Sequence, residues 1–251
     1  IMLCESTNVE RDGYSMSETI VSDNLDRLFL QHRFKRLIIA TFASNVYRIQ
    51  QILNIAYKNK RKVALSGRSM VKVIEASAKI GEMTIPQNTL IDIDKIKNYQ
   101  DKDLVVVSTG SQGEPMSALT RMAMGESSQV TIGKNDTIII SANPIPGNEK
   151  MIYRVINNLY KKGARVIYES LEKIHVSGHA CQEEHKILHS LLKPKFFIPV
   201  HGEQKHLRKN GEIACAMGIP HENIFIGNVG NTDKTELVQF VENVLVSLCN
   251  A

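Results

Sequence analysis

The sequence has no tryptophan, few other aromatic residues and only four cysteines. None of the cysteines forms a CxxC pair, which argues against both a structural zinc site and a disulfide framework. An aromatic content of 6% argues against a single-strand-binding platform that works by stacking alone. No apolar run approaches the roughly 20 residues of a membrane span. We therefore expect a cytoplasmic protein with reduced thiols and no membrane partner.

The chain of 251 residues is long enough for one large α/β domain or two smaller ones without covalent staples. Its net charge of +5 is compatible with a polyanionic partner, and equally with a mildly basic enzyme that has none. The sequence starts on Ile1, inside what reads as a short strand, so we expect a segment excised from a longer protein.

Apolar runs and helical patterns alternate along most of the chain. Strands are expected at residues 37–41, 62–65, 104–107, 137–140 and 166–168. Amphipathic helices, in which apolar residues recur about every 3.6 positions, follow these strands. Another helix, which begins at the S-x-x-E capping box of residues 15–18, precedes the first strand. Repeated strand–loop–helix units predict an α/β fold with a doubly wound, mostly parallel sheet.

The last third of the chain predicts a second, smaller group of elements. A helix from about residue 182 is expected to use Ile187, Leu188, Leu191 and Leu192 as its apolar face. Strands are expected at residues 196–200 and 223–226. A terminal amphipathic helix is expected after residue 232, and the sequence does not indicate its function.

Small and hydrogen-bonding residues gather where several of these strands end. Ligands of such sheets bind outside the carboxyl ends of the strands. Ser44, Asn45, Arg68, Ser177 and Gly178 are therefore candidates for a phosphate pocket built from hydroxyls, backbone N–H groups and one guanidinium. Taken one at a time, these turns are better explained as ordinary helix caps. Gly110 and Gly113 frame only GxxG, which does not indicate a dinucleotide site.

Four histidines could carry chemistry. His179 and His201 each stand in a glycine-containing turn, where the ring could enter a cleft or simply bond a neighbouring carbonyl. His185 and His189 are four residues apart on one helix, a spacing that suits metal ligands. Because no third ligand is evident and charged residues surround this pair, a solvated surface is the favoured interpretation.

Seven short sequence segments taken together resemble the ribonuclease J family. These are bacterial RNA-processing enzymes of the metallo-β-lactamase superfamily, in its β-CASP branch. The segments are Glu5-Ser6-Thr7-Asn8, residues 40–45, Gly67-Arg68-Ser69-Met70, residues 109–115, residues 144–148, residues 175–179 and residues 199–203. They occur in the family's order from about Glu5 to Ile226.

The resemblance implies a role for each of three residues. The acidic residue of the first β-CASP motif falls on Glu5, and the histidines of the next two fall on His179 and His201. In family terms His201 is a ligand of a two-zinc site, with manganese or magnesium as alternatives. His179 acts near the leaving oxygen, and Glu5 orients His179. The implied activity is hydrolysis of RNA by 5′-to-3′ exonuclease and endonuclease action, with 5′-monophosphorylated RNA preferred.

The resemblance also implies a domain plan. Residues 1–18 end a metallo-β-lactamase segment, 19–190 form the β-CASP domain, 191–231 return to the metallo-β-lactamase domain, and 232–251 have no assigned role. The family's HxHxDH metal motif has no counterpart in this sequence. We therefore expect an incomplete or absent metal centre and no hydrolysis by this chain alone. In the full-length protein the resemblance implies a homo-oligomer or a paralogue partner.

Two other functions remain open. A non-catalytic β-CASP paralogue could serve as a scaffold for an active subunit, although the presence of Glu5, His179 and His201 argues against it. A small-molecule α/β enzyme could use the same turns for a nucleotide, although the dinucleotide fingerprint is missing.

Overall fold

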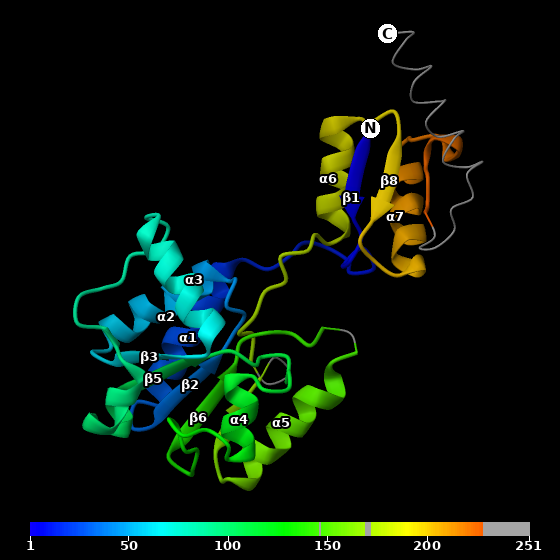
Figure 1. Ribbon diagram of the computed structural model, residues 1–251. Coiled ribbons are helices and arrows are strands. Elements are labelled where there is room, and N and C mark those ends of the chain that lie inside the picture. The colour runs from blue at the N-terminus through cyan, green and yellow to red at the C-terminus, as the bar shows by residue number, and fades with distance from the viewer. Residues whose placement is uncertain (146, 169–171, 228–251) are drawn as a thin grey trace. The chain divides into compact units, whose positions relative to one another are not determined.

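The chain divides into two compact units in the computed structural model, which describes residues 1–145, 147–168 and 172–227 (Figure 1). Unit 1 combines Ile1–Met16 with Ser177–Ala251, and unit 2 is Ser17–Val176. Unit 2 is therefore inserted into unit 1 in the sequence. The expected boundaries at 18/19 and 190/191 differ from this division, which falls at 16/17 and 176/177. The expected helix after residue 232 lies outside the described residues.

Unit 2 is built on a six-stranded sheet in the order β4-β3-β5-β2-β6-β7. The strands are β2 (Arg36–Ala40), β3 (Lys62–Ser66), β4 (Leu90–Ile91), β5 (Leu104–Ser108), β6 (Asp136–Ile140) and β7 (Arg165–Ile167). All five pairings are parallel. The chain runs outward from β2 through β3 to β4, returns in β5 and then continues to β6 and β7. This topology confirms the predicted doubly wound α/β fold.

Helices cover both faces of this sheet (Figure 1). They are α1 (Glu18–Gln31), α2 (Val46–Lys58), α3 (Arg68–Lys79), α4 (Ala118–Met124) and α5 (Glu149–Lys161), with 3-10 helices η1 (Ile93–Asn98) and η2 (Asp101–Asp103). Successive strand side chains alternate between two cores. Leu37 and Ile39 pack in the core with α1, α2 and α3, whereas Ile38 and Ala40 pack in the core with α4 and α5. Burial on both faces explains why the strands read as continuous apolar runs.

A buried arginine ties the two ends of unit 2 together. The Arg48 side chain is fully buried, and its Nη2 donates to both carboxylate oxygens of Glu18 at 2.8 and 2.7 Å. Its Nη1 donates to the carbonyl oxygen of Ile174 at 2.7 Å and to the hydroxyl of Ser141. Because Arg48 is buried whereas Glu18 is 32% exposed, removing Glu18 would leave a buried charge with neutral partners only, which is strongly destabilising. The start and the end of unit 2 are thereby held at one point.

Unit 1 is smaller and is also α/β. Its elements are β1 (Met2–Glu5), α6 (Gln182–Leu192), β8 (Phe197–Val200), α7 (Gln204–Ala216) and the 3-10 helix η3 (His221–Asn223). β1 pairs in parallel with β8, in a register that runs from Met2 opposite Phe197 to Glu5 opposite Val200. Its small core contains Met2, Phe197, Ala214 and Ile219.

The prediction for α6 was wrong about which face is buried. His185 and His189 are 0% and 3% exposed, whereas Ile187, Leu188, Leu191 and Leu192 are 39–75% exposed. Both stripes have helical spacing, so periodicity alone could not choose between them. The ring of His189 packs edge-on against Phe197, with 4.6 Å between centroids, and His185 Nδ1 lies 3.5 Å from Cys4 Sγ. Contacts with β1 and β8 therefore select the histidine stripe.

Two local predictions were also wrong. The N-cap of α1 is Ser17, which accepts from Thr19 N–H, whereas Ser15 donates its hydroxyl to Glu184 at 2.6 Å. Residues 223–226 form no strand, because η3 leads into a single bridge between Ile224 and Phe197. No helix in the described part of the chain is both long and apolar enough to span a membrane.

Candidate functional site

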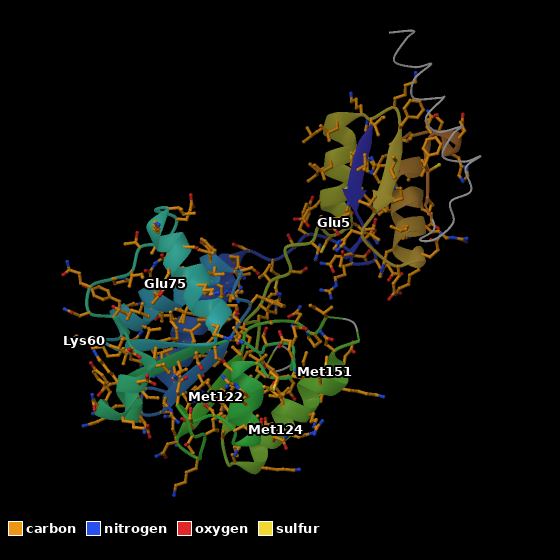
Figure 2. The ribbon with its side chains drawn as sticks, viewed as in Figure 1. Glu5, Lys60, Glu75, Met122, Met124 and Met151 are labelled. Carbon is orange, nitrogen blue, oxygen red and sulfur yellow. The ribbon has the colours of Figure 1, made fainter. Side chains whose placement is uncertain are left out.

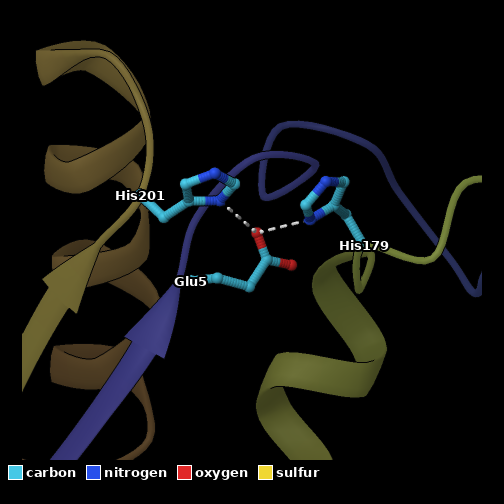
Figure 3. A group of neighbouring side chains, drawn as sticks. All are labelled: Glu5, His179 and His201. Carbon is cyan, nitrogen blue, oxygen red and sulfur yellow. Dashed lines mark ion pairs between the residues drawn. The ribbon is translucent and has the colours of Figure 1, made fainter. Parts of the chain in front are cut away.

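Glu5, His179 and His201 meet in unit 1, as the sequence predicted (Figure 3). Glu5 Oε2 lies 3.2 Å from His179 Nδ1 and 4.0 Å from His201 Nδ1. The two imidazole rings are 5.3 Å apart between centroids and tilted by 32°. One potential ligand atom from each residue lies within 4.8 Å of the others, and no other group of this kind occurs in the described residues.

Parallel strand pairing brings Glu5 and His201 to the same edge. Glu5 ends β1 opposite Val200, and His201 follows directly after β8. The backbone N–H of Ser6 donates to the carbonyl oxygen of His201 at 3.2 Å, which extends the pairing by one step. His201 has a φ of 54°, in the left-handed region that non-glycine residues seldom occupy. Backbone strain of this kind concentrates at functional sites.

His179 is held by the loop that follows β1. The side-chain amide of Asn8 donates to Ser177 Oγ at 2.9 Å and to the carbonyl oxygen of His179 at 3.1 Å. The backbone N–H of His179 also donates to Ser177 Oγ, at 3.2 Å. This network fixes the turn before α6 and with it the position of the His179 ring.

The Glu5 carboxylate is held in its charged form. It accepts from the Thr7 N–H at 2.7 Å and from the Ala180 N–H at 3.0 Å. Burial alone raises the pKa of Glu5, but hydrogen bonds from Thr7 and Ala180 and the charge of His179 outweigh it, so the pKa is lowered. The carboxylate oxygen lies 3.2 Å from His179 Nδ1, a position that can accept a hydrogen bond from the tautomer with its hydrogen on Nδ1.

Thr7 completes the orientation of His201. Its Oγ1 lies 3.1 Å from His201 Nδ1 and 3.3 Å from the His201 carbonyl oxygen, which can accept the one hydroxyl proton. The hydroxyl oxygen then accepts from Nδ1–H, so that Nε2 keeps a free lone pair. This is the tautomer that a histidine metal ligand needs.

Asn210 supports the same strand end from α7. It is fully buried, and its side-chain amide donates to the carbonyl oxygen of Glu5 at 3.1 Å and to Ser6 Oγ at 3.0 Å. Sequence reasoning missed Thr7 and Asn210 as site residues. Thr7 could have been found, because it stands in the same string as Glu5. Asn210 carried no signal, since an asparagine inside a polar helix usually faces solvent.

The predicted phosphate residues fall into the two units. Ser44, Asn45 and Arg68 belong to unit 2, at the carboxyl ends of β2 and β3, which both border β5. Arg68 is exposed and forms no ion pair within the described residues, whereas Asn45 caps α2 by accepting from Arg48 N–H. Ser177 and Gly178 belong to unit 1, where Ser177 Oγ anchors the His179 turn.

The donor set of the site fits a metal ion. Imidazole nitrogens are zinc ligands, and each histidine keeps Nε2 available when its Nδ1 faces Glu5, which then acts as the orienting carboxylate. A two-metal centre needs more ligands than these three residues provide. The residues therefore suit part of such a centre.

Comparison with protein families finds two matches. Residues 34–159 match the family described as "Ribonuclease J, beta-CASP domain", and residues 163–213 match "Zn-dependent metallo-hydrolase RNA specificity domain". The first match covers half of the chain.

Curated proteins show the same similarity. "Ribonuclease J" of Synechocystis sp. is 48% identical over 230 residues, which cover 92% of this chain and 36% of that protein. "Ribonuclease J" of Helicobacter pylori is 42% identical, over 92% of this chain and 33% of that protein. "Ribonuclease J 1" of Streptococcus pyogenes is 41% identical, over 92% of this chain and 41% of that protein. The chain thus spans between a third and about two-fifths of the length of these relatives.

Proposed function

The chain belongs to the ribonuclease J family, and on that premise we propose that it is part of a metal-dependent ribonuclease that acts in cytoplasmic RNA processing and decay. The observation that carries this proposal is the convergence of Glu5, His179 and His201 at the carboxyl ends of two parallel strands. Unit 1 would then belong to the catalytic domain, and unit 2 would be its β-CASP insertion.

Each of the three residues has a role that follows from its contacts. His201 would hold a zinc ion through Nε2, because its Nδ1 faces Thr7 and Glu5. His179 would donate a proton, and Glu5 would hold the hydrogen on His179 Nδ1 and so orient the ring. The complete centre would contain two zinc ions, with manganese or magnesium as alternatives. Such metals lower the pKa of bound water to about 7 and stabilise the charge of the reacting phosphate.

The reaction is hydrolysis of a phosphodiester. A bond forms between the water oxygen and phosphorus, and the bond between phosphorus and the 3′ oxygen breaks. The proton of His179 passes to the departing 3′ oxygen, the attacking water releases a proton to solvent, and His179 regains a proton from solvent before the next cycle. The products are a 3′-hydroxyl and a 5′-monophosphate. Since each cut leaves a 5′-monophosphate, a preference for that end suits repeated 5′-to-3′ cleavage.

We also propose that Ser44, Asn45, Arg68, Ser177 and Gly178 contribute to binding RNA phosphates. The support is chemical, because Arg68 offers an exposed guanidinium without an acidic partner among the described residues, and Ser44 is exposed. In the full-length protein we propose a homo-oligomer or a pairing with a paralogue. A non-catalytic scaffold is the less favoured function, because a scaffold has no need for a charged carboxylate held against two imidazoles.

The experiment compares the 251-residue chain with the longer polypeptide encoded by its gene. Both are incubated with zinc or manganese and with RNA that carries a 5′-monophosphate or a 5′-triphosphate. We expect the longer protein to degrade the monophosphorylated RNA faster and the 251-residue chain to degrade neither. Failure of the longer protein to cleave any RNA would remove the enzymatic proposal, and equal decay of both substrates would remove the proposed preference.

Variants of the longer protein separate the roles of the two histidines. His179→Ala should slow cleavage by about 100- to 10,000-fold, as expected for a lost general acid, while metal content stays nearly unchanged. His201→Ala should lower metal content together with activity. If His179→Ala loses metal to the same extent as His201→Ala, then His179 is a ligand and not the proton donor.

A further inference from the structure

The outward face of α5 is a stripe of basic residues. Lys150, Arg154 and Lys161 lie on one side of the helix with Tyr153 and Asn157, and all five are exposed. The buried side consists of Ile152, Val155, Ile156 and Leu159. The apolar residues anchor α5 to the sheet, so that the basic residues are presented to solvent on a rigid element.

This stripe lacks the acidic partners that other helices provide. In the described part of the chain no ion pair involves Lys150, Arg154 or Lys161, whereas Lys58 pairs with Asp26 at 2.6 Å. Lys150 and Arg154 are four residues apart, a spacing at which like charges destabilise a helix. A polyanion bound along this face would relieve that repulsion.

The helix dipole accounts for only part of the stripe. A lysine in the last turn, such as Lys161, faces the negative end of the dipole and is stabilised there. Lys150 stands in the first turn, where the dipole disfavours a positive charge, and Arg154 stands in the middle of the helix. Stabilisation of α5 itself therefore does not explain these two residues.

A shallow groove runs beside the stripe. It has a volume of about 610 Å³ and is lined by Lys150, Tyr153, Arg154, Asn158 and Met124, the last labelled in Figure 2. The Asn158 amide lies 3.4 Å from the sulfur of Met124 at the end of α4. Tyr153 is 50% exposed, so that much of its side chain is accessible to solvent beside the cations. Cations with an interleaved aromatic ring are the features with which proteins bind single-stranded nucleic acid.

We propose that this face of α5 binds the phosphate backbone of single-stranded RNA without regard to sequence, with Tyr153 stacking on a base. The inference rests on the proposed function and adds a surface of unit 2 to RNA binding. Lys150 and Lys161 are about 16 Å apart along the helix axis, at 1.5 Å per residue. At roughly 3.4 Å per nucleotide of a stacked strand, this length covers about five nucleotides. Residues 17–176 contain 23 Lys and Arg against 15 Asp and Glu, which adds a general attraction for RNA.

The test measures how the 251-residue chain binds a labelled 20-nucleotide single-stranded RNA between about 50 and 200 mM salt. The variant Lys150→Gln/Arg154→Gln/Lys161→Gln is compared with Lys60→Gln/Lys72→Gln/Lys79→Gln, which removes three exposed charges elsewhere in unit 2. Lys60, labelled in Figure 2, follows α2, and the other two lie on α3 around Glu75. Circular dichroism would check that both variants are folded.

We expect the α5 variant to bind at least tenfold more weakly than the control variant. The slope of log affinity against log salt should become shallower by about 2, because each lost phosphate contact removes roughly 0.7. Tyr153→Leu should weaken binding by about tenfold and leave the salt slope unchanged.

Equal losses in the two triple variants would overturn the inference, because net charge would then explain the binding. RNA binding by the α5 variant at the wild-type level would overturn it as well, and in both cases the proposed function stands. A wild-type chain that binds no RNA at any salt concentration would overturn the inference together with the RNA-binding part of the proposed function. Binding to anionic phosphatidylserine vesicles that depends on α5, without RNA binding, would assign the face to a membrane surface.

Discussion

Thr7 shows how a single hydroxyl can decide the chemical state of a neighbouring histidine. It touches His201 twice, at the ring nitrogen and at the carbonyl oxygen, and its backbone N–H holds Glu5. One residue therefore fixes both the carboxylate and the tautomer of the imidazole. Partners of this kind tune a metal ligand without touching the metal.

Thr7→Val keeps the shape of the side chain and the backbone bond to Glu5 but removes the hydroxyl. In the longer protein we expect His201 to become a mixture of tautomers and the zinc affinity of the site to fall by about 10- to 100-fold. Nitrogen chemical shifts of the His201 ring and a zinc titration against a competing chelator would measure both effects. Thr7→Ser, the matched control, should behave like the wild type. A valine variant with the wild-type tautomer and affinity would show that Glu5 alone orients the ring.

Single residues also show what the sequence could and could not predict. Glu5, His179 and His201 were found because motif strings and strand ends marked them. Asn210 was not found, since its role depends on how α7 packs against the end of β1, which local sequence does not encode. His185 and His189 were predicted to lie on the surface because no third metal ligand was evident and charged residues surround them, and the packing of His189 against Phe197 overrides that prediction.

At the scale of elements, α6 buries two histidines, and most of their ring nitrogens form no hydrogen bond within the described residues. His185 Nε2 and both ring nitrogens of His189 have no partner among the described residues. Burial lowers the pKa of both histidines, an effect that outweighs the nearby Glu5 and Glu184 at His185. Both side chains are therefore mainly neutral in the folded protein at pH 7.

This arrangement makes α6 sensitive to acid. The unfolded chain binds protons at these histidines near their ordinary pKa of 6.5, whereas the folded chain binds them only at lower pH. The free energy of unfolding should therefore fall as pH drops below about 6.5, until the folded-state pKa values are reached. Denaturant titrations at pH 8, 7, 6 and 5 would show this loss, which should be smaller in His185→Leu/His189→Leu.

An exposed histidine provides the control for this experiment. His221 lies at the surface in η3, and His221→Gln should keep the wild-type dependence on pH. His32 and His175 also have lowered pKa values, the latter about 4, so that part of the pH dependence should persist in the α6 variant. Identical pH profiles for the wild type and the double variant would contradict the prediction.

At the scale of the whole molecule, the two units have very different folding requirements. Unit 2 is one continuous segment with local strand–helix–strand connections, and Arg48 joins its two ends. Unit 1 requires β1 to pair with β8. The paired residues Met2 and Phe197 are separated by nearly the whole described chain. Closing a flexible loop of that length costs about 5 kcal/mol in entropy. Prior folding of unit 2 would shorten the loop and reduce this cost.

We therefore expect Ser17–Val176 expressed alone to fold cooperatively, and residues 177–227 alone, which lack β1, to stay unfolded. Circular dichroism and denaturant unfolding would test both segments. In the intact chain, hydrogen exchange during refolding should protect the amides of β2 and β5 before those of β8. Protection of β8 before β2, or a Ser17–Val176 segment without a cooperative transition, would contradict this order.

The parallel pairing of β1 with β8 also has a consequence for protein synthesis. Thr7 and His201 are separated by 194 positions, and ribosomes add about 5–20 amino acids per second. Roughly 10 to 40 seconds therefore pass between the synthesis of Glu5 and the synthesis of His201. Glu5, His179 and His201 cannot meet before His201 has been synthesised. The site therefore cannot form early in translation.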